Sequence, residues 1–117
     1  MFYLVYNLRL EQVLQNIIQN AVKYSPRGGA IVVETFAREQ SVCVSVSDQG
    51  IGIPQDALHR LFRRFYRADN VDDKQISGMG IGLYVVKEIV ALHGGSVAVE
   101  STEGAGSKFT VCLPALL

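Results

Sequence analysis

Hydrophobic residues near the start of the chain recur at the spacing of a helix that is apolar on one side. The pattern runs through Leu10, Val13, Leu14, Ile17, Ile18, Ala21 and Val22. Residues 25–29, with a proline and two glycines, end this helix. A second stretch, residues 81–95, repeats the spacing and stops at a glycine pair; its stripe is Ile81, Val85, Ile89 and Leu92. We therefore predict two helices, each with one buried side.

Between and after these helices, β-branched residues alternate with small polar ones. Residues 30–38 and 41–48 read as one hairpin, and residues 96–101 and 107–114 as another, while residues 55–66 read as a short helix. In the second strand the apolar side chains of Val42, Val44 and Val46 oppose those of Cys43, Ser45 and Ser47. A sheet with one apolar face is covered by helices on that face only. The pattern predicts an α+β fold, a two-layer α/β sandwich with a mixed sheet.

Composition limits the possible partners. The chain has 117 residues, which fits a single domain over residues 1–117, and its 11 basic residues balance its 11 acidic ones. No basic excess suggests a nucleic acid partner, and no apolar run is long enough to span a membrane. Cys43 and Cys112 form no C-x-x-C pair, so we expect no disulfide and a reducing, cytoplasmic setting.

The stretch "NIIQNAVKYSP", residues 16–26, places two asparagines in register on an otherwise apolar helix. Asn16, Asn20 and Lys23 share one flank, and Glu11 and Gln15 lie on the other. An amide oxygen suits Mg²⁺, and a lysine suits phosphate. The alternative for this flank is a solvated helix edge.

The segment "SDQGIGIP" follows a strand and carries a carboxylate with two glycines. Asp48, at the end of the strand, can accept a hydrogen bond from an exocyclic amine, and Gly50 and Gly52 would let the backbone approach a flat ligand. The alternative is an ordinary turn. The segment is not a dinucleotide fingerprint, because the third glycine is replaced by Gln55.

Two further segments could hold an anion. In "SGMGIGL", Gly78, Gly80 and Gly82 precede a helix, which frees backbone N–H groups for phosphate; a plain hinge is the alternative. In "LFRRFYRAD", three guanidiniums stand before a long polar loop, residues 67–80; an exposed basic helix face is the alternative. These are Arg63, Arg64 and Arg67.

Taken in order, these four segments resemble the N, G1, F and G2 boxes of the catalytic ATP-binding domain of sensor histidine kinases. That domain shares a superfamily with gyrase, the ninety-kilodalton heat-shock chaperone and the mismatch-repair ATPase. The resemblance covers about residues 9–114 and includes the tail "VVKEIVALHGGSVAVESTEGAGSKFTVCLP". It implies the Bergerat fold, with about five strands and about three helices on one face.

The resemblance also implies roles for individual residues. Asn20 is expected to bind Mg²⁺, Asp48 to bond the adenine amino group, and residues 67–80 to form a lid over ATP that is mobile without nucleotide. The catalytic set is Asn16, Lys23 and Arg67, and Phe62 with Phe65 belongs to the F box. The ATP-binding set is Asn20, Lys23, Tyr24, Asp48, Gly50, Gly52, Ile53, Phe65, Tyr66, Arg67, Gly78, Met79, Gly80, Ile81, Gly82 and Leu83.

The chain also departs from the family pattern. The stretch before Arg9 lacks the usual Gly-Asp sequence, Arg63 replaces an acidic residue of the F box, and Met79 and Ile81 vary the G2 box. Neither His59 nor His93 lies in a phosphoacceptor motif.

The resemblance implies the ATP-binding catalytic domain of a longer, membrane-attached sensor kinase. Such a domain uses Mg²⁺ and ATP to phosphorylate a histidine on a separate dimerisation and phosphoacceptor domain, which then serves a response regulator. The alternatives are a nucleotide-binding regulatory module, an ATPase, or an anti-sigma serine kinase. Hydrolytic relatives carry a glutamate four residues before the metal-binding asparagine, and Asn16 in its place favours transfer to a histidine over hydrolysis.

Overall fold

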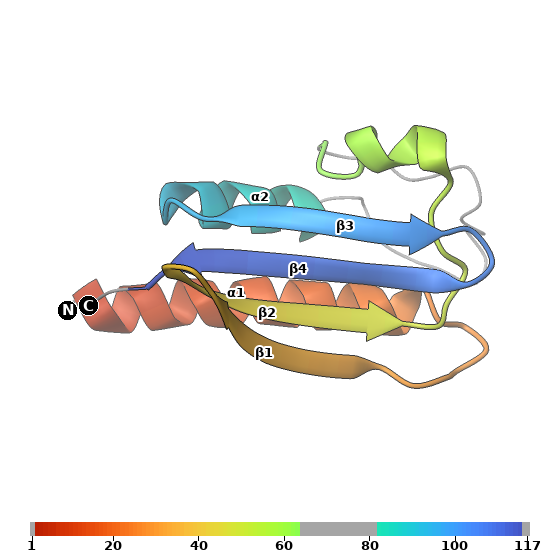
Figure 1. Cartoon of the computed structure of the whole chain (residues 1–117), viewed down its shortest axis with the longest axis horizontal. Helices are drawn as coiled ribbons and strands as arrows, with labels where there is room; N and C mark the ends of the chain where they lie inside the picture. The colour runs from red at the N-terminus through yellow and green to blue at the C-terminus, as the bar shows by residue number, and fades with distance from the viewer. Residues whose placement is uncertain (1, 64–81, 116–117) are drawn as a thin grey trace.

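The computed structural model describes residues 2–63 and 82–115, with side chains from residue 9 onward. Its elements are α1 (Phe2–Lys23), β1 (Val32–Arg38), β2 (Ser41–Asp48), the 3₁₀ helix η1 (Gln55–Arg60), α2 (Gly82–Leu92), β3 (Ser96–Thr102) and β4 (Gly106–Pro114). Figure 1 shows α1 and α2 side by side behind the sheet. No helix in these ranges is long and apolar enough to cross a membrane.

The described strands form one sheet in the order β1-β2-β4-β3. Helices on one face of this sheet confirm the predicted two-layer α+β fold. The prediction of a mixed sheet of about five strands was wrong: the described part of the chain has four strands, and every pairing is antiparallel. Short turns join β1 to β2 and β3 to β4, and such turns can only connect antiparallel neighbours. The central strands β2 and β4, which no turn joins, are antiparallel as well.

The core lies between the sheet and the two helices. Helix α1 contributes a stripe of buried residues spaced four apart: Val13, Ile17 and Ala21. The sheet contributes Val46, Phe109 and Val111, and α2 contributes Val86, Ile89 and Val90. The buried side of α2 therefore differs from the predicted one. Ile89 is buried as predicted, but Leu92, at the end of the helix, is 77% exposed. Periodicity alone could not orient α2, because the helix is apolar on most sides.

Part of the apolar surface of α1 remains in solvent. Leu14, Ile18 and Val22 were predicted to be buried with the rest of the pattern, yet they are 36%, 37% and 57% exposed. They lie on the flank of α1 away from the buried stripe, and the partly exposed Val33 of the edge strand β1 is also apolar. Only one of the two apolar stripes of α1 thus contacts the described core.

The segment predicted as a short helix forms η1, a 3₁₀ helix that closes one end of the core. Ala57 and Leu61 are buried there. Phe62 packs edge-to-face on Phe109, with ring centroids 6.3 Å apart and an interplanar angle of 83°. The F-box aromatic Phe62 is therefore a core anchor in this fold.

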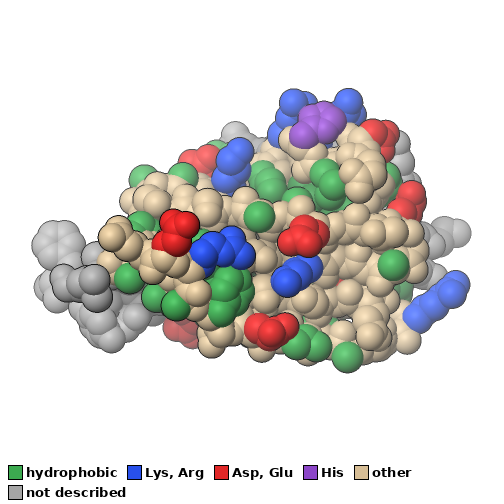
Figure 2. Space-filling view, viewed as in Figure 1, with side chains coloured by type: hydrophobic (Ala, Val, Ile, Leu, Met, Phe, Trp, Pro, Cys, Tyr) green, Lys and Arg blue, Asp and Glu red, His purple; other side chains and the backbone are tan. Residues whose placement is uncertain are grey.

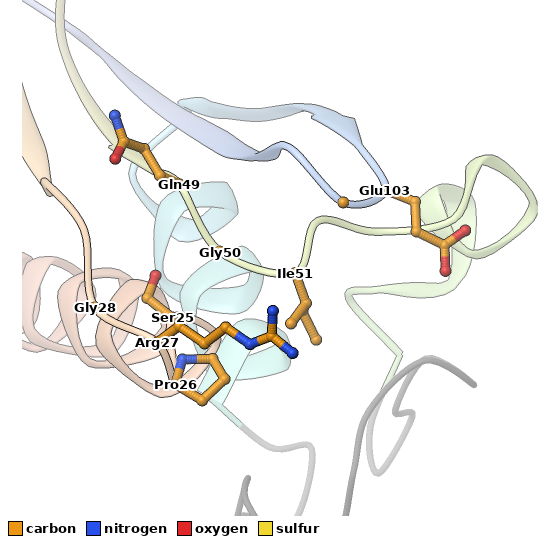
Figure 3. Close-up of a pocket in the computed structure, with 9 residues that line it drawn as sticks. Ser25, Pro26, Arg27, Gly28, Gln49, Gly50, Ile51 and Glu103 are labelled. Carbon is orange, nitrogen blue, oxygen red and sulfur yellow. The ribbon is translucent and has the colours of Figure 1, made fainter.

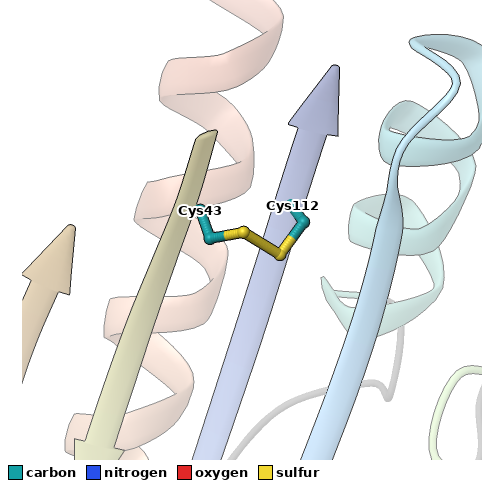
Figure 4. Close-up of a disulfide and its surroundings, with 2 residues drawn as sticks. All are labelled: Cys43 and Cys112. Carbon is teal, nitrogen blue, oxygen red and sulfur yellow. A yellow bond between two sulfur atoms is a disulfide. The ribbon is translucent and has the colours of Figure 1, made fainter. Parts of the chain in front are cut away.

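The opposite face of the sheet, turned to the viewer in Figure 2, carries small polar side chains with acidic and basic ones between them. Cys43 and Cys112 lie on this face, directly opposite each other on β2 and β4, with Cα atoms 4.1 Å apart. They form a disulfide (Figure 4). The prediction of unpaired cysteines was wrong, because the two residues are 69 positions apart and the sequence does not reveal how β2 and β4 align.

Candidate functional site

Three segments that carried predicted site residues meet at one end of the molecule. The second half of α1, the C-terminal end of β2 with its following loop, and the first turn of α2 all lie toward the right of Figure 1. The side chain of Asn16 bridges two of them: its Nδ2 donates to the carbonyl oxygen of Gly82 at 3.4 Å. The fold therefore brings the predicted N-box, G1-box and the end of the G2-box segments to the same place.

The asparagine flank of α1 faces the start of α2. Asn16 and Asn20 are half-buried, whereas Lys23 and, on the other flank, Gln15 are exposed. The amide side chains are thus placed at the edge of the core and not in open solvent. A neutral amide at this edge offers an oxygen ligand and no titratable base.

Asp48 is a buried carboxylate at the last position of β2, only 9% exposed. Its Oδ1 accepts two backbone hydrogen bonds, from the N–H of Gly50 at 2.9 Å and from the N–H of Ser107 at 3.3 Å. Burial raises the pKa of this carboxyl above its ordinary value, and the bonds from Gly50 and Ser107 oppose that rise. No residue in the described ranges donates to Oδ2, so this oxygen is available to a ligand.

The glycines after Asp48 are also needed for packing within the protein. A Cβ on Gly50 would collide with the carbonyl oxygen of Tyr24. This oxygen accepts a hydrogen bond from the N–H of Ile51 at 2.9 Å. Gly52 has a φ of +69°, and a Cβ there would collide with the carbonyl oxygen of Thr102. The two glycines let the loop pack against the end of α1 and the end of β3, so their open sides face protein backbone.

Two serines belong to this site that the sequence analysis missed. Ser107 holds Asp48 through its backbone, and its hydroxyl oxygen lies 2.8 Å from that of Ser101. Ser101 in turn accepts the N–H of Ile53 at 2.8 Å. The short turn between β3 and β4 could have predicted that Ser101 and Ser107 face each other. Nothing in the sequence could have placed Asp48 beside them.

The remaining predicted site residues divide into two groups. Of those within the described ranges, Ile53 is buried in the core, Leu83 packs against it, and Tyr24 is half-buried at the end of α1. The predicted lid, residues 67–80, lies outside the described residues. So do seven predicted site residues: Phe65, Tyr66, Arg67, Gly78, Met79, Gly80 and Ile81.

A pocket of about 410 Å³ opens next to the loop after Asp48 (Figure 3). Arg27 and Glu103 line it on either side of Ile51. Its lining comes from the turn after α1, the loop and the β3–β4 turn: Ser25, Pro26, Arg27, Gly28, Gln49, Gly50, Ile51, Glu103 and Gly104. Neither Asp48 nor the asparagine flank lines it, so this pocket lies beside the candidate site and not within it.

The oxygen ligands near the asparagine flank are few. No group of three His, Cys, Asp or Glu side chains that could hold a metal occurs in the described part of the chain. Asn20 offers one amide oxygen at the core edge, next to Asn16. Mg²⁺ commonly takes only one or two protein ligands and completes its shell with phosphate and water. The residues present therefore fit a magnesium ion that arrives with a phosphate chain.

Both histidines have hydrogen-bond partners close by in the chain. His93, just after α2, has its Nδ1 2.7 Å from the carbonyl oxygen of Ile89, so Nδ1 carries the proton and donates it. His59, in η1, is exposed and accepts from Nε of Arg60 at 3.3 Å. The contact of His93 with Ile89 holds its ring at the end of α2.

Comparison with known proteins gives a consistent result. The family model described as histidine kinase-, DNA gyrase B- and HSP90-like ATPase matches residues 6–117. Sensor histidine kinase WalK of Bacillus subtilis (strain 168) is 43% identical over 108 residues, which is 91% of this chain and 18% of WalK. Thus the chain spans less than a fifth of the length of that relative.

Solved structures agree with the sequence match. The mycobacterial sensor histidine kinase MprB superposes with a TM-score of 0.82 and 32% identity, over 91% of this chain and 72% of that one. Full-length ShkA in complex with AMPPNP gives a TM-score of 0.79 and 34% identity, over 91% of this chain and 21% of that one. The chain therefore belongs to the family of histidine kinase-, DNA gyrase B- and HSP90-like ATPases.

Proposed function

We propose that this chain is the Mg·ATP-binding catalytic domain of a two-component sensor histidine kinase. It binds ATP at the end of the sheet and transfers the terminal phosphoryl group to a histidine on a separate dimerisation and phosphoacceptor domain. Membership of the ATPase family and 43% identity to a sensor histidine kinase support this assignment. The relative ShkA was solved with AMPPNP, an ATP analogue, which supports a nucleotide as the ligand.

The observation that carries the proposal is the state of Asp48. Its Oδ1 is held by two backbone N–H groups while its Oδ2 has no donor within the described ranges. Oδ2 is not one of the fully buried atoms that lack a partner, so solvent or a ligand reaches it, and a ligand that donates there gains a charge-assisted hydrogen bond. The exocyclic amine of adenine is such a donor, and Asp48 then distinguishes adenine from bases that lack it.

Asn16 favours phosphoryl transfer over hydrolysis. Its amide donates to the backbone of α2, and it cannot take a proton from water as a carboxylate can. A histidine acceptor is already nucleophilic and does not require such a base. The competing functions are a regulatory module that holds nucleotide without transferring phosphate, and an ATPase or anti-sigma serine kinase of the same family. These functions can be told apart by their products: a regulatory module transfers no phosphate, an ATPase releases free phosphate, and a serine kinase phosphorylates a serine.

Asn20 would hold Mg²⁺ through its amide oxygen, with Lys23 near the phosphates. The ion, when bound, neutralises charge on the phosphates that separate during transfer. We expect Asn20→Asp to change the Mg²⁺ concentration needed for half-maximal ATP binding, because it replaces a neutral ligand with a charged one. Gln15→Ala, on the exposed flank of the same helix, is the matched control and should leave that concentration unchanged. If the two variants behave alike, the asparagine flank does not bind the metal.

We place the domain in the cytoplasm, in a parent kinase attached to the membrane. Its direct partner is the phosphoacceptor domain, and a response regulator receives the phosphoryl group from that domain. The equal numbers of basic and acidic residues argue against nucleic acid as a partner. Because cytosolic thiols are usually kept reduced, Cys43 and Cys112 would there be held mainly as the dithiol.

Phosphotransfer in trans tests this function. The chain is incubated with radiolabelled ATP, alone and with a dimerising domain that carries a phosphoacceptor histidine. Label that is acid-labile and base-stable should appear on the added domain, and little phosphate should be released without it. Rapid phosphate release without an acceptor would indicate an ATPase, and nucleotide binding without either product a regulatory module. Label on the chain itself, lost in His59→Ala, would contradict the absence of an acceptor here.

A further inference from the structure

Asp48 is one of three polar residues in a row across the sheet. In the strand register Asp48 faces Ser107, and Ser107 faces Ser101 on its other side. The next row inward pairs Phe109 with Val46 and with Val99, which all belong to the apolar face beneath the helices. Alternate residues of a strand point to the same face, so the polar row ends the face that the helices cover.

The hydroxyl proton of Ser101 has a defined direction. Its Oγ lies 2.8 Å from the carbonyl oxygen of Gly106, which can only accept, so Ser101 donates its single proton there. The N–H of Ile53 points at the same Oγ from 2.8 Å and can only donate. Ser101 has one donor and two acceptor sites, which leaves one acceptor site for its third partner.

That third partner is Ser107, whose Oγ lies 2.8 Å from Oγ of Ser101. Because Ser101 has already donated its proton to Gly106, Ser107 must be the donor of this bond. Ser107 is buried, and its hydroxyl is left with lone pairs only. Beside it, Asp48 offers only the lone pairs of Oδ2. The row therefore presents acceptors and no side-chain donor.

We propose that Ser101 is a positioning residue that sets base selectivity by holding the hydroxyl proton of Ser107. The inference rests on the proposed binding of ATP at Asp48. A surface of acceptors favours the amino group of adenine and disfavours guanine, which carries a carbonyl oxygen at the same position. If Ser101 no longer accepts the proton, the Ser107 hydroxyl can turn and donate to that oxygen.

The test compares dissociation constants for ATP and GTP in the wild-type chain, Ser101→Ala and Ser101→Thr. We expect Ser101→Ala to reduce the preference for ATP over GTP by about tenfold, the effect of one misdirected hydrogen bond. Ser101→Thr keeps a hydroxyl and should retain the wild-type ratio. A residue that only braces the β3–β4 hairpin would weaken both nucleotides together, so an unchanged ratio in Ser101→Ala overturns the proposal.

A double variant tests whether the hydroxyl proton of Ser107 causes the change in selectivity. In Ser101→Ala/Ser107→Ala no hydroxyl remains to donate, so the gain in GTP affinity seen in Ser101→Ala should disappear; its persistence would overturn the proposal. Ser45→Ala, a buried serine on the other face of the sheet, is the control and should keep the wild-type ratio. If Ser101→Ala melts below the assay temperature, Ser101→Cys replaces it, with a weaker acceptor and a smaller shift expected in the same direction. A wild-type chain that binds neither nucleotide would instead disprove the proposed function.

Discussion

Asp48 has two carboxylate oxygens with different partners, and a single substitution can separate them. In Asp48→Asn the amide oxygen can still accept from Gly50 and Ser107, but the oxygen that faces the ligand becomes an NH₂ group. A charge-assisted bond of about 1.5–3 kcal/mol is then replaced by two opposed donors. We expect ATP affinity, measured by calorimetric titration, to fall at least about tenfold.

The fold should tolerate this change, because the two backbone bonds to position 48 are kept. The melting temperature of Asp48→Asn in the absence of nucleotide should therefore stay close to that of the wild type. Asp56→Asn, in the exposed first turn of η1, is the matched control for loss of a carboxylate and should bind ATP normally. Equal ATP affinities for Asp48→Asn and Asp56→Asn would exclude Asp48 from base recognition.

Burial of Asp48 also predicts how binding and stability depend on pH. Its pKa is raised above the ordinary value of 3.8, so the folded chain takes up a proton at a higher pH than the unfolded chain does. As pH falls through the raised pKa toward 3.8, this group should increase the free energy of unfolding while ATP binding weakens, since the protonated carboxyl is a poorer acceptor.

Both trends are read as differences between the wild type and Asp48→Asn, which cancels the titration of other groups. The difference in unfolding free energy, from urea titrations at several pH values, should be constant above the raised pKa and should shift in favour of the wild type below it. A difference that stays flat down to pH 3.8 would show that burial does not perturb this carboxyl.

Among the connecting elements, the loop after β2 depends on Gly50. A methyl group at this position would overlap the carbonyl oxygen of Tyr24, which belongs to the hydrogen-bonded backbone at the end of α1. We expect Gly50→Ala to lower the free energy of unfolding by about 1–3 kcal/mol, as overpacking does, and to weaken ATP binding because Asp48 loses the donor at position 50.

Gly82→Ala is the matched control for stability. Among residues 2–63 and 82–115, a Cβ at Gly82 would meet no atom within 4 Å, and alanine is the better helix former at the start of α2. Denaturant unfolding should therefore show no loss of stability in this variant. A loss as large as that of Gly50→Ala would mean that glycine flexibility, and not close packing, explains both positions.

The elements themselves could be predicted where local pattern decides. The strand at residues 41–48 was predicted with its observed bounds, because alternation and flanking turns fix a half-buried strand. The alignment of β4 beside β2 could not be predicted, since it joins segments far apart in the chain. For that reason the cysteine pair and the Asp48–Ser107–Ser101 row were missed, although all five residues lie in predicted strands or at their ends.

The roles assigned to the candidate site residues stay predictions, and the structure shows how the described ones pack. Asn16 contacts the start of α2, and the loop after Asp48 contacts the end of α1 through Ile51 and Tyr24, so these predicted segments adjoin the same helix. Gly50 and Gly52 pack on protein backbone, which the sequence did not reveal, because a glycine that meets backbone and one that meets a ligand look alike in sequence; their contact with the base stays a prediction. The contributions of Arg67 and Gly80 stay predictions, since they lie outside the described residues.

For the whole molecule, the disulfide ties the two central strands together. Its ends are 69 residues apart, and closing a loop of that size in the unfolded chain corresponds to about 4 kcal/mol in the chain-entropy model. We expect Cys43→Ser/Cys112→Ser to lose up to that amount of unfolding free energy, with less than about a twofold change in ATP affinity, since Asp48 is at the far end of β2.

Reductant provides the control for this prediction. Urea unfolding of the wild type with excess thiol should give the stability of the double serine variant, and the double variant should not respond to thiol at all. A wild type whose midpoint is the same with and without reductant would show that the cysteine pair is not closed in solution.

The same disulfide also changes the connectivity of the chain. It closes residues 43–112 into a covalent ring, with α1 and β1 as a tail on one side. Asn16 and Asn20 lie in the tail, whereas Asp48 and Ser107 lie in the ring. One backbone cut between residues 44 and 111 opens the ring without releasing a piece, so the nicked molecule gains the mass of one water and keeps both parts of the site. It should run as a single species on a non-reducing gel and separate into two fragments only when a thiol is added.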